Sequence, residues 1–299
     1  MSHSGDVLAV IFDFDNTLMP DSITKLLVRK RIDPEDFWLR QAGKLVRRGY
    51  DQIHAYLNVM LKNIGQGKPL GPLTNVDLLR FGSTLDKSFY PGLPRLFDDL
   101  KRIVGGYSNI TIEFYIISGG LQEIIEGSKV VDKYFDAVYG SQLAGDTPDG
   151  VLKYVKRAIT FTEKTRYLFE INKGVRARNS HREVVNEDIP YEQRRIPFSN
   201  MFYIGDGFTD IPCLSLVQKG VGHYKGGMAI GIFDPSDEKS ARRSFMRLLL
   251  PRRVVTLHAP RYGPKQELGS LLRVAVTTAC SKIRLRREQA YKEQIGPVL

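Results

Sequence analysis

The stretch that decides the fold of this chain is Val-Leu-Ala-Val-Ile-Phe-Asp-Phe-Asp-Asn-Thr, residues 7–17. An apolar run ends abruptly here in two carboxylates, Asp13 and Asp15. Short apolar runs bounded by turn residues are typical of buried parallel strands. In open α/β sheets, ligands bind beyond the carboxyl ends of such strands. The pattern therefore predicts an α/β protein with a strand at residues 7–13 and a functional site at the carboxyl end of that strand.

A second stretch repeats the pattern: Met-Phe-Tyr-Ile-Gly-Asp-Gly-Phe-Thr-Asp at residues 201–210. Two parallel strands that both end in Asp aim their carboxylates at one point. Carboxylates that converge in this way repel one another unless a cation lies among them, and sites made only of oxygen atoms suit Mg²⁺. The sequence therefore predicts a Mg²⁺ site formed by Asp13, Asp15, Asp206 and Asp210.

The remaining apolar runs complete a sheet. Core strands are predicted at 111–117, 136–140 and 228–233, and helical patterns at 94–104 and 121–130 lie between them. This alternation indicates a Rossmann-like, doubly wound parallel sheet. Residues 141–163 contain Asp-Thr-Pro-Asp-Gly between β-favouring residues, which predicts a β-hairpin.

Residues 18–90 have a different character, with helical patterns beginning at Pro34 and at 51–63 and 74–87. We interpret them as a helical cap, inserted after the first strand, which would cover the site as a lid. The catalytic core is then predicted to comprise residues 1–17 and 91–240. The aromatic residues Phe37, Trp38, Tyr50 and Tyr56 are interpreted as the core of the cap rather than as a substrate cage, and any of them that faces the catalytic core would shape substrate specificity.

The charge is concentrated in the C-terminal part of the chain. Residues 241–299 hold 13 Lys/Arg and three Glu, so they carry +10 of the net charge of +11. We predict that they form a basic, mainly helical extension, and that truncation after Asp237 leaves the chemistry intact. Two interpretations remain open: a solvated helix face, or a docking surface for an acidic partner, RNA or an anionic membrane surface.

We expect the four carboxylates to have different roles in catalysis. Asp13 is the candidate nucleophile, which would attack phosphorus and form an aspartyl-phosphate. Asp15 would protonate the leaving oxygen and later activate water, which requires a separate carboxyl group with a raised pKa. Asp206 would be a Mg²⁺ ligand, and Asp210 a ligand or a residue that orients one.

Two further groups would complete the site. Ser118 and the N–H of the following Gly119 suit a phosphate oxygen at a strand-to-helix turn. Lys164 and Lys173 compete as the site cation. Lys173 precedes Gly174, a C-terminal cap glycine, where a basic residue is favoured for purely local reasons. Lys164 lies in the first turn, where the helix dipole disfavours it, so it is the better functional candidate.

Taken together, Asp13-Phe-Asp15-Asn-Thr17, Ser118-Gly-Gly, a lysine and Gly205-Asp206-Gly-Phe-Thr-Asp210 resemble the haloacid dehalogenase (HAD) superfamily, and most closely its phosphoserine-phosphatase-like branch. The resemblance covers residues 5–235. It implies a Rossmann-like core with a helical cap, and it places Thr17 with Ser118 among the phosphate-binding residues. It also implies a phosphatase or phosphotransferase rather than a dehalogenase, because dehalogenases lack the second carboxylate, here Asp15.

The chain departs from the phosphoserine phosphatases at one point. Where those enzymes carry an acid nine residues after the nucleophile, this chain has Ser22, with Asp21 beside it. The resemblance therefore does not specify phosphoserine as the substrate.

The function that we expect is that of a Mg²⁺-dependent phosphomonoesterase acting on a small phosphorylated metabolite. The alternatives are a phosphotransferase of the same mechanism, and a regulatory or binding protein that uses the basic C-terminal residues and hydrolyses weakly. The N-terminal sequence does not resemble a signal peptide, there are only two cysteines, and no apolar run approaches the roughly 20 residues of a membrane span. These features favour the cytoplasm.

Overall fold

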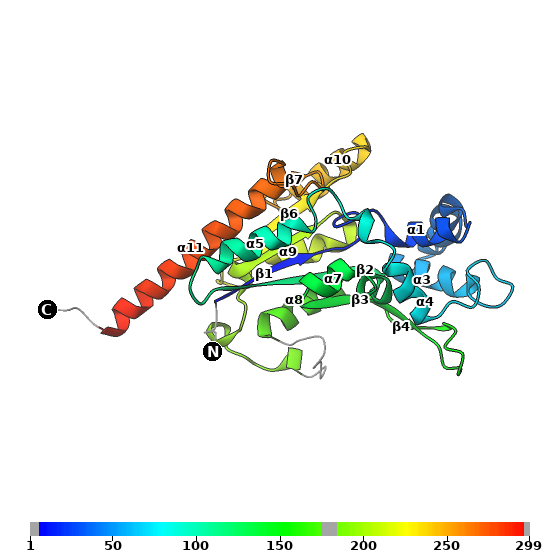
Figure 1. Cartoon of the computed structure of the whole chain (residues 1–299), viewed down its shortest axis with the longest axis horizontal. Coiled ribbons are helices and arrows are strands. Elements are labelled where there is room, and N and C mark those ends of the chain that lie inside the picture. Colours follow the sequence, from blue (N-terminus) through cyan, green and yellow to red (C-terminus); the bar gives the residue numbers. More distant parts are fainter. Residues whose placement is uncertain (1–5, 175–183, 296–299) are drawn as a thin grey trace.

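Seven strands form one sheet, in the order β4-β3-β2-β1-β5-β6-β7, in the computed structural model, which describes residues 6–174 and 184–295 (Figure 1). All neighbouring strands run parallel except β3 and β4, which form the antiparallel hairpin predicted within residues 141–163. The predicted Rossmann-like doubly wound sheet is thus confirmed. The strands are β1 (Val7–Phe12), β2 (Thr111–Leu121), β3 (Ala137–Ala144), β4 (Tyr154–Arg157), β5 (Met201–Gly205), β6 (Met228–Ile232) and β7 (Thr256–His258).

Side chains of the central strand β1 point alternately to two separate apolar clusters. Val10 belongs to the cluster that includes Phe97 of α5, whereas Ile11 belongs to the cluster that includes Leu168 of α8. Because successive residues of a strand face opposite sides, β1 is buried on both faces and is apolar throughout. The helices on the first face are α5 (Arg95–Gly105), α7 (Lys129–Tyr134) and α11 (Glu267–Ile295), and those on the second are α8 (Phe161–Lys173) and α9 (Ile211–Lys219).

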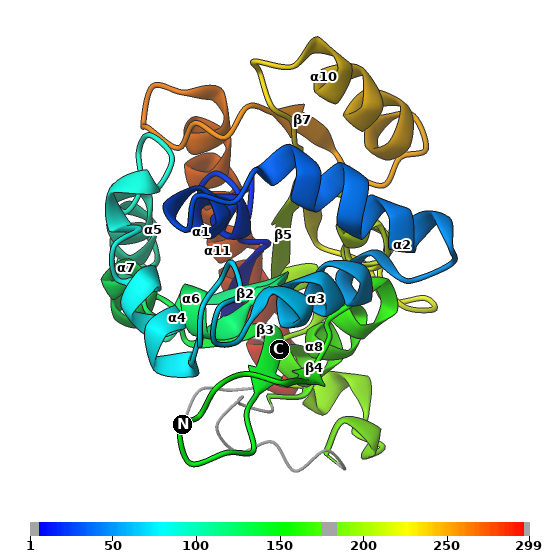
Figure 2. The same cartoon turned by 90° about the vertical axis from the view of Figure 1, so that its right-hand side faces the viewer.

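Residues 18–90 form helices at the carboxyl end of the sheet (Figures 1 and 2). The helices predicted at 51–63 and 74–87 are present, whereas α1 was not predicted. These helices pack closely on the core where α4 contacts α6. A Cβ added to Gly82 would lie 2.0 Å from the carbonyl oxygen of Ile124, and a Cβ added to Gly127 would lie 2.1 Å from that of Leu79. The helices are α1 (Ser22–Arg29), the π-helix η1 (Asp36–Ala42), α2 (Gly43–Arg47), α3 (Gln52–Asn63) and α4 (Asn75–Gly82), with α6 (Gln122–Glu126) on the core side.

The C-terminal residues are part of the sheet and of its covering helices. Strand β7 pairs with β6, helix α11 packs against α5, and the fully buried Tyr262 donates its hydroxyl proton to the carbonyl of Thr17 over 2.7 Å. The boundary predicted at residue 240 therefore falls before a strand of the core sheet. A strand as short as β7 gives too little alternation to be recognised in the sequence. Residues 1–5 of the predicted core and 296–299 of the predicted extension lie outside the described residues.

Several short elements complete the described chain. They are the 3-10 helices η2 (Asp86–Ser88), η4 (Val184–Asn186), η5 (Tyr191–Gln193), η6 (Phe198–Asn200) and η7 (Phe208–Asp210), then α10 (Glu238–Ser244) and the π-helix η8 (Phe245–Leu249) that continues it. Within residues 6–174 and 184–295, no helix is both long and apolar enough to cross a membrane.

Candidate active site

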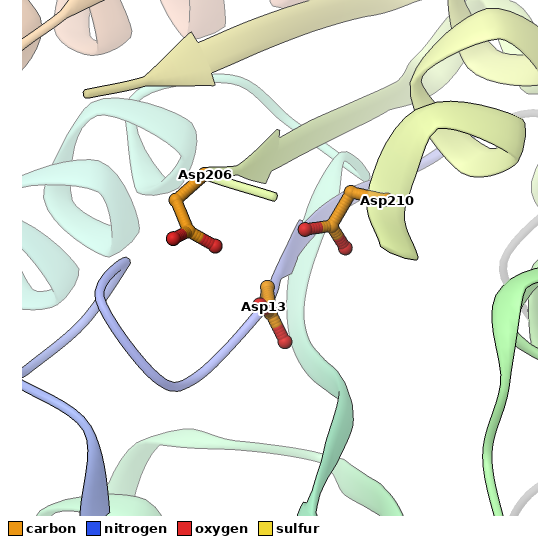
Figure 3. Close-up of side chains that lie close together, drawn as sticks. All are labelled: Asp13, Asp206 and Asp210. Atoms are coloured by element: carbon orange, nitrogen blue, oxygen red, sulfur yellow. The ribbon is translucent and has the colours of Figure 1, made fainter. Parts of the chain in front are cut away.

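Three carboxylates meet beyond the carboxyl ends of β1 and β5 (Figure 3). Asp13 directly follows β1, Asp206 directly follows β5, and Asp210 ends the short helix η7. One oxygen atom of each lies within 4.8 Å of the others. Since β1 and β5 are parallel neighbours, their carboxyl ends share one edge of the sheet, as the sequence predicted.

Lys164 is the lysine that joins this group. It lies in the first turn of α8, is fully buried, and donates hydrogen bonds from Nζ to Oδ1 of Asp13 over 3.0 Å and to Oδ1 of Asp210 over 2.7 Å. Lys173 instead donates to the backbone carbonyls of Val185 and Glu187. The geometry thus places Lys164, rather than Lys173, beside the candidate nucleophile.

Asp210 is held by the protein at both carboxylate oxygens. Besides Lys164, its Oδ1 accepts the hydroxyl proton of Tyr203 over 2.6 Å, and its Oδ2 accepts from the backbone N–H of Gly207 over 3.1 Å. Asp210 is fully buried, whereas Asp13 and Asp206 line a cavity. Asp210 is therefore placed to orient Lys164 and the loop of Asp206.

The electrostatics of the group favour a bound cation. Burial, followed by repulsion from Asp210, raises the pKa of Asp13 to about 6 even though Lys164 opposes the shift. Burial and the charges of Asp13 and Asp210 raise the pKa of Asp206 well above its ordinary value. Burial alone would lower the pKa of Lys164, but Asp13 and Asp210 outweigh it and raise that pKa. One lysine thus faces three carboxylates, an oxygen-only donor set that fits Mg²⁺.

Asp15 lies in the same cavity but does not belong to this group of three carboxylates. Its Oδ1 accepts from the backbone N–H of Ser22 over 2.7 Å, and its Oδ2 lies against Gly120, where an added Cβ would come within 2.6 Å of it. Burial and the nearby Asp21 raise the pKa of Asp15 well above its ordinary value. A carboxyl group that holds its proton in this way suits general acid catalysis better than metal ligation through the side chain.

Ser118 and Gly119 line the same cavity as Asp15 and belong to the carboxyl end of β2. The Oγ of Ser118 accepts from the N–H of Gly120 over 3.0 Å. The carbonyl of Gly119 accepts from the hydroxyls of Tyr56 over 2.6 Å and Ser141 over 2.9 Å. These hydrogen bonds hold the end of β2 at the place where the sequence predicted a contact with phosphate.

The cavity has a volume of about 270 Å³. A larger hollow of about 640 Å³ lies between α11 and the starts of β5 and β6, but its lining residues include no Asp, Glu, His or Cys. The smaller cavity, in contrast, is lined by Asp13, Asp15 and Asp206, which can bind a metal and transfer protons, so it is the candidate active site.

Comparisons with known proteins bear on the family and the fold of the chain. No family model matches the chain. It is 30% identical over 266 residues to an uncharacterized protein of Borreliella burgdorferi, covering 82% of this chain and 89% of that one, so the two belong to one family. Among solved structures, a HAD family hydrolase from Salmonella enterica serovar Typhi superposes over 91% of this chain and 72% of its own, with a TM-score of 0.56 and 14% identity. A gene product of Archaeoglobus fulgidus shows a weaker likeness, with a TM-score of 0.49 and 12% identity over 93% of this chain and 85% of its own.

The chain has the fold of the haloacid dehalogenase (HAD) superfamily. The HAD motifs predicted from the sequence occupy the carboxyl edge of this fold. The first follows β1, the second ends β2, the lysine begins α8 and the last follows β5. These four segments are distant in sequence and meet only because β1 lies between β2 and β5.

One predicted site residue does not reach the cavity of the HAD fold. Thr17 was expected to contact phosphate, but it is fully buried and does not line the cavity. The chain turns sharply after Phe14, where Asn16 adopts a positive φ of 57° and the N–H of Leu18 bonds to the carbonyl of Phe14. This turn carries Thr17 into the interior, beneath Tyr262.

The helical insertion, which the sequence predicted to cover the site, forms one wall of the cavity. Residues from the helical insertion line it, and Trp38 and Tyr56, interpreted as cap core, are among them; their ring centroids lie 5.6 Å apart. Of the other two aromatic residues, Phe37 is buried and Tyr50 exposed. The sequence did contain a signal for helix α1, which was not predicted. Asp21 is a favourable N-cap residue, and its side chain accepts a hydrogen bond from the N–H of Thr24 at the start of α1. The insertion contributes Asp21, Ile23, Trp38, Gln52, Ile53 and Tyr56 to the cavity.

Several basic residues of the C-terminal segment form hydrogen bonds or ion pairs with other parts of the fold. Arg273 pairs with Asp99 over 2.6 Å, and Arg286 donates to Oδ1 of Asn200 over 3.0 Å. Arg287 donates to the carbonyl of Ser108 over 3.0 Å and pairs with Asp6. These arginines help to dock α11, so they are not free for an acidic partner. Binding of such a partner through the remaining basic residues stays a proposal.

Proposed function

We propose that this protein is a Mg²⁺-dependent phosphomonoesterase that works through a phosphorylated Asp13. The observation that carries the proposal is the position of Asp13, which faces the cavity with Lys164 bonded to it on one side and Asp206 on the other. A carboxylate fixed between a cation and a metal-binding acid can attack phosphorus without being repelled by the phosphate charge.

The residues support a two-step reaction. Asp13 attacks the phosphorus atom and the bond from phosphorus to the ester oxygen breaks, while Asp15 gives its proton to that oxygen. Asp15, now ionised, takes a proton from water, which attacks phosphorus and releases phosphate from Asp13. The Ser118 hydroxyl and the backbone N–H of Gly119 would hold the phosphate oxygens during both steps.

Asp13 and Asp206 would hold the metal, with Asp210 positioning them. When bound, Mg²⁺ supplies positive charge that offsets the charge of the phosphate and of the carboxylates. Asp15 favours this activity over dehalogenation, because protonation of a leaving alkoxide requires a second carboxyl group. We also propose a cytoplasmic location, which the unpaired state of both Cys213 and Cys280 supports.

The test is phosphate release from p-nitrophenyl phosphate and from a panel of small phosphomonoesters. We expect activity that EDTA abolishes and Mg²⁺ restores, and none from Asp13→Asn. Asp146→Asn is the matched control, because Asp146 is half exposed and pairs with Lys153 outside the cavity. No release by Mg²⁺-replete protein from any phosphomonoester, or full activity in Asp13→Asn, would refute the proposal.

A further inference from the structure

The helix that runs through α10 and η8 presents a stripe of hydroxyl and guanidinium groups. Ser240, Arg243, Ser244 and Arg247 follow the spacing i, i+3, i+4, i+7, which places them on one helix face. All four line one hollow of about 220 Å³. Figures 1 and 2 place α10 at the same end of the molecule as α1, at the carboxyl edge of the sheet. The stripe therefore faces the functional edge of the fold.

The opposite wall of this hollow belongs to the candidate active site. Asp206, Gly207 and Phe208 line both the hollow and the active-site cavity. Phe208 is 52% exposed, and the guanidinium of Arg247 lies 5.2 Å from its ring centroid. Arg243 also lines a third hollow of about 210 Å³ that again includes Asp206. Both arginines thus lie next to the active-site cavity, on the side of Asp206, the acid proposed to bind the metal.

The two sides of the active site differ in charge. The described residues that line the active-site cavity include Asp13, Asp15, Asp21 and Asp206 but no Lys or Arg. A substrate with a second negative charge would be repelled at the side formed by Asp21. The α10 side offers two guanidinium groups: Arg243 is paired with the partly exposed Asp237 over 3.0 Å and shares the third hollow with Asp234 and Asp237, whereas Arg247 lines the hollow whose described residues include no acid other than Asp206. Guanidinium groups bind phosphate and carboxylate through paired hydrogen bonds, so this side suits an anion.

We propose that Arg243 and Arg247 bind a second anionic group of the substrate, which is therefore a small phosphomonoester carrying a further phosphate or carboxylate. This inference rests on the proposed phosphomonoesterase activity. The phosphate to be cleaved lies at Asp13, and the second anion lies beyond Phe208 against the stripe. The C-terminal segment thereby acquires a role in substrate recognition through residues that do not dock α11.

The test measures hydrolysis of alkanediol bisphosphates of two to four carbons and of the matching alkyl monophosphates. In a parallel series, ω-carboxyalkyl phosphates test a carboxylate as the second anion. We expect wild-type kcat/KM to be about tenfold or more higher for at least one doubly anionic substrate. Arg243→Gln/Arg247→Gln should remove this preference by raising KM, and should leave KM for the monophosphates within about twofold. Arg242→Gln is the control, since Arg242 is an exposed neighbour that lines neither hollow. Absence of the preference in the wild type, or its retention in the double variant, would overturn the inference.

Binding to a hydrolysis-deficient protein separates this inference from the proposed function. Titration calorimetry would compare the bisphosphates on Asp13→Asn with and without the two arginine changes. If the bisphosphate Kd rises about tenfold when the two arginines are replaced, the result supports the subsite even if the wild-type protein hydrolyses no phosphomonoester. Hydrolysis with equal binding by both proteins supports the phosphatase and refutes the subsite. Because both arginines are exposed, the urea midpoints of the variants should match and exclude misfolding.

Discussion

Lys164 Nζ lies 3.0 Å from Oδ1 of Asp13, although the two residues are 151 positions apart in the chain. The same Nζ bonds to Asp210, and all three side chains are buried. The lysine thus pairs its charge with the candidate nucleophile and connects it to Asp210, whose carboxylate also holds the N–H of Gly207 in the loop of Asp206.

Lys164→Met should reduce phosphate release by at least about a hundredfold, because Asp13 and Asp210 lose the cation that pairs with them. Breaking a buried pair on one side should also cost about 3–5 kcal/mol in the free energy of unfolding. Lys173→Met, on the same helix, should keep its activity, since Lys173 bonds only to backbone carbonyls outside the cavity among the described contacts. Steady-state kinetics and urea unfolding measure both effects; similar activity in the two variants would contradict the assignment.

Tyr203→Phe tests how Asp210 is held. Loss of the 2.6 Å hydrogen bond leaves a buried carboxylate with one donor fewer, so we expect a destabilisation of about 1–3 kcal/mol and a several-fold fall in kcat. Tyr134→Phe removes a comparable bond to Asp98, 2.9 Å long and distant from the cavity, and should leave kcat unchanged. An equal effect of both variants on kcat would show that Tyr203 has only a structural role.

Gly120→Ala tests the position of Asp15. The added Cβ would lie 2.6 Å from Oδ2 of Asp15, so the carboxyl group must move and kcat should fall about tenfold or more. Gly105→Ala is the control, because a Cβ at Gly105, at the end of α5, meets no atom within 4 Å. A kcat for Gly120→Ala within twofold of wild type would argue against a catalytic role for Asp15.

The raised pKa of Asp13 predicts how stability depends on pH and metal. Its pKa is about 6 in the folded protein and 3.8 ordinarily, so the folded state holds this proton more tightly than the unfolded chain. The contribution of Asp13 protonation to the free energy of unfolding is therefore fully present below about pH 4 and is lost as the pH rises through about 6. Mg²⁺ would bind the ionised form of the carboxylate, so we expect it to raise Tm more at about pH 7.5 than at about pH 5. Thermal scans with EDTA or Mg²⁺ would check this, and Asp13→Asn should weaken the pH dependence.

Truncation after Asp237 should prevent cooperative folding, contrary to the expectation from the charge distribution. It removes β7, the buried Tyr262 and the apolar face of α11, which includes the fully buried Leu272, Val276 and Cys280. Each large apolar side chain contributes about 1.5–3 kcal/mol by burial, so the sum is comparable with the whole net stability of a domain, about 5–15 kcal/mol. Circular dichroism and urea unfolding would test this; a truncated chain with an unchanged midpoint would show that residues 238–299 are a true appendage.

Much of the site was readable from the sequence because its residues obey local rules. An apolar strand that ends in Asp is a pattern of a few adjacent residues, and the parallel sheet then brings two such ends together. Lys164 could be preferred over Lys173 because it violates the helix-dipole rule that Lys173 satisfies. The hairpin of β3 and β4 likewise followed from adjacent turn residues.

The tertiary structure decided what depends on segments far apart in sequence. Thr17 fits the motif, yet a turn at Asn16 buries it under Tyr262, 245 positions away. Trp38 and Tyr56 pack like core residues and also form a wall of the cavity. Arg243 and Arg247 belong to a segment whose charge suggested a tail, and only the pairing of β7 with β6 shows that it is part of the core. The sequence by itself thus determined the chemistry at the strand ends, whereas the packing of distant helices determined which side chains surround it, because a cavity wall is set by neighbours in space rather than along the chain.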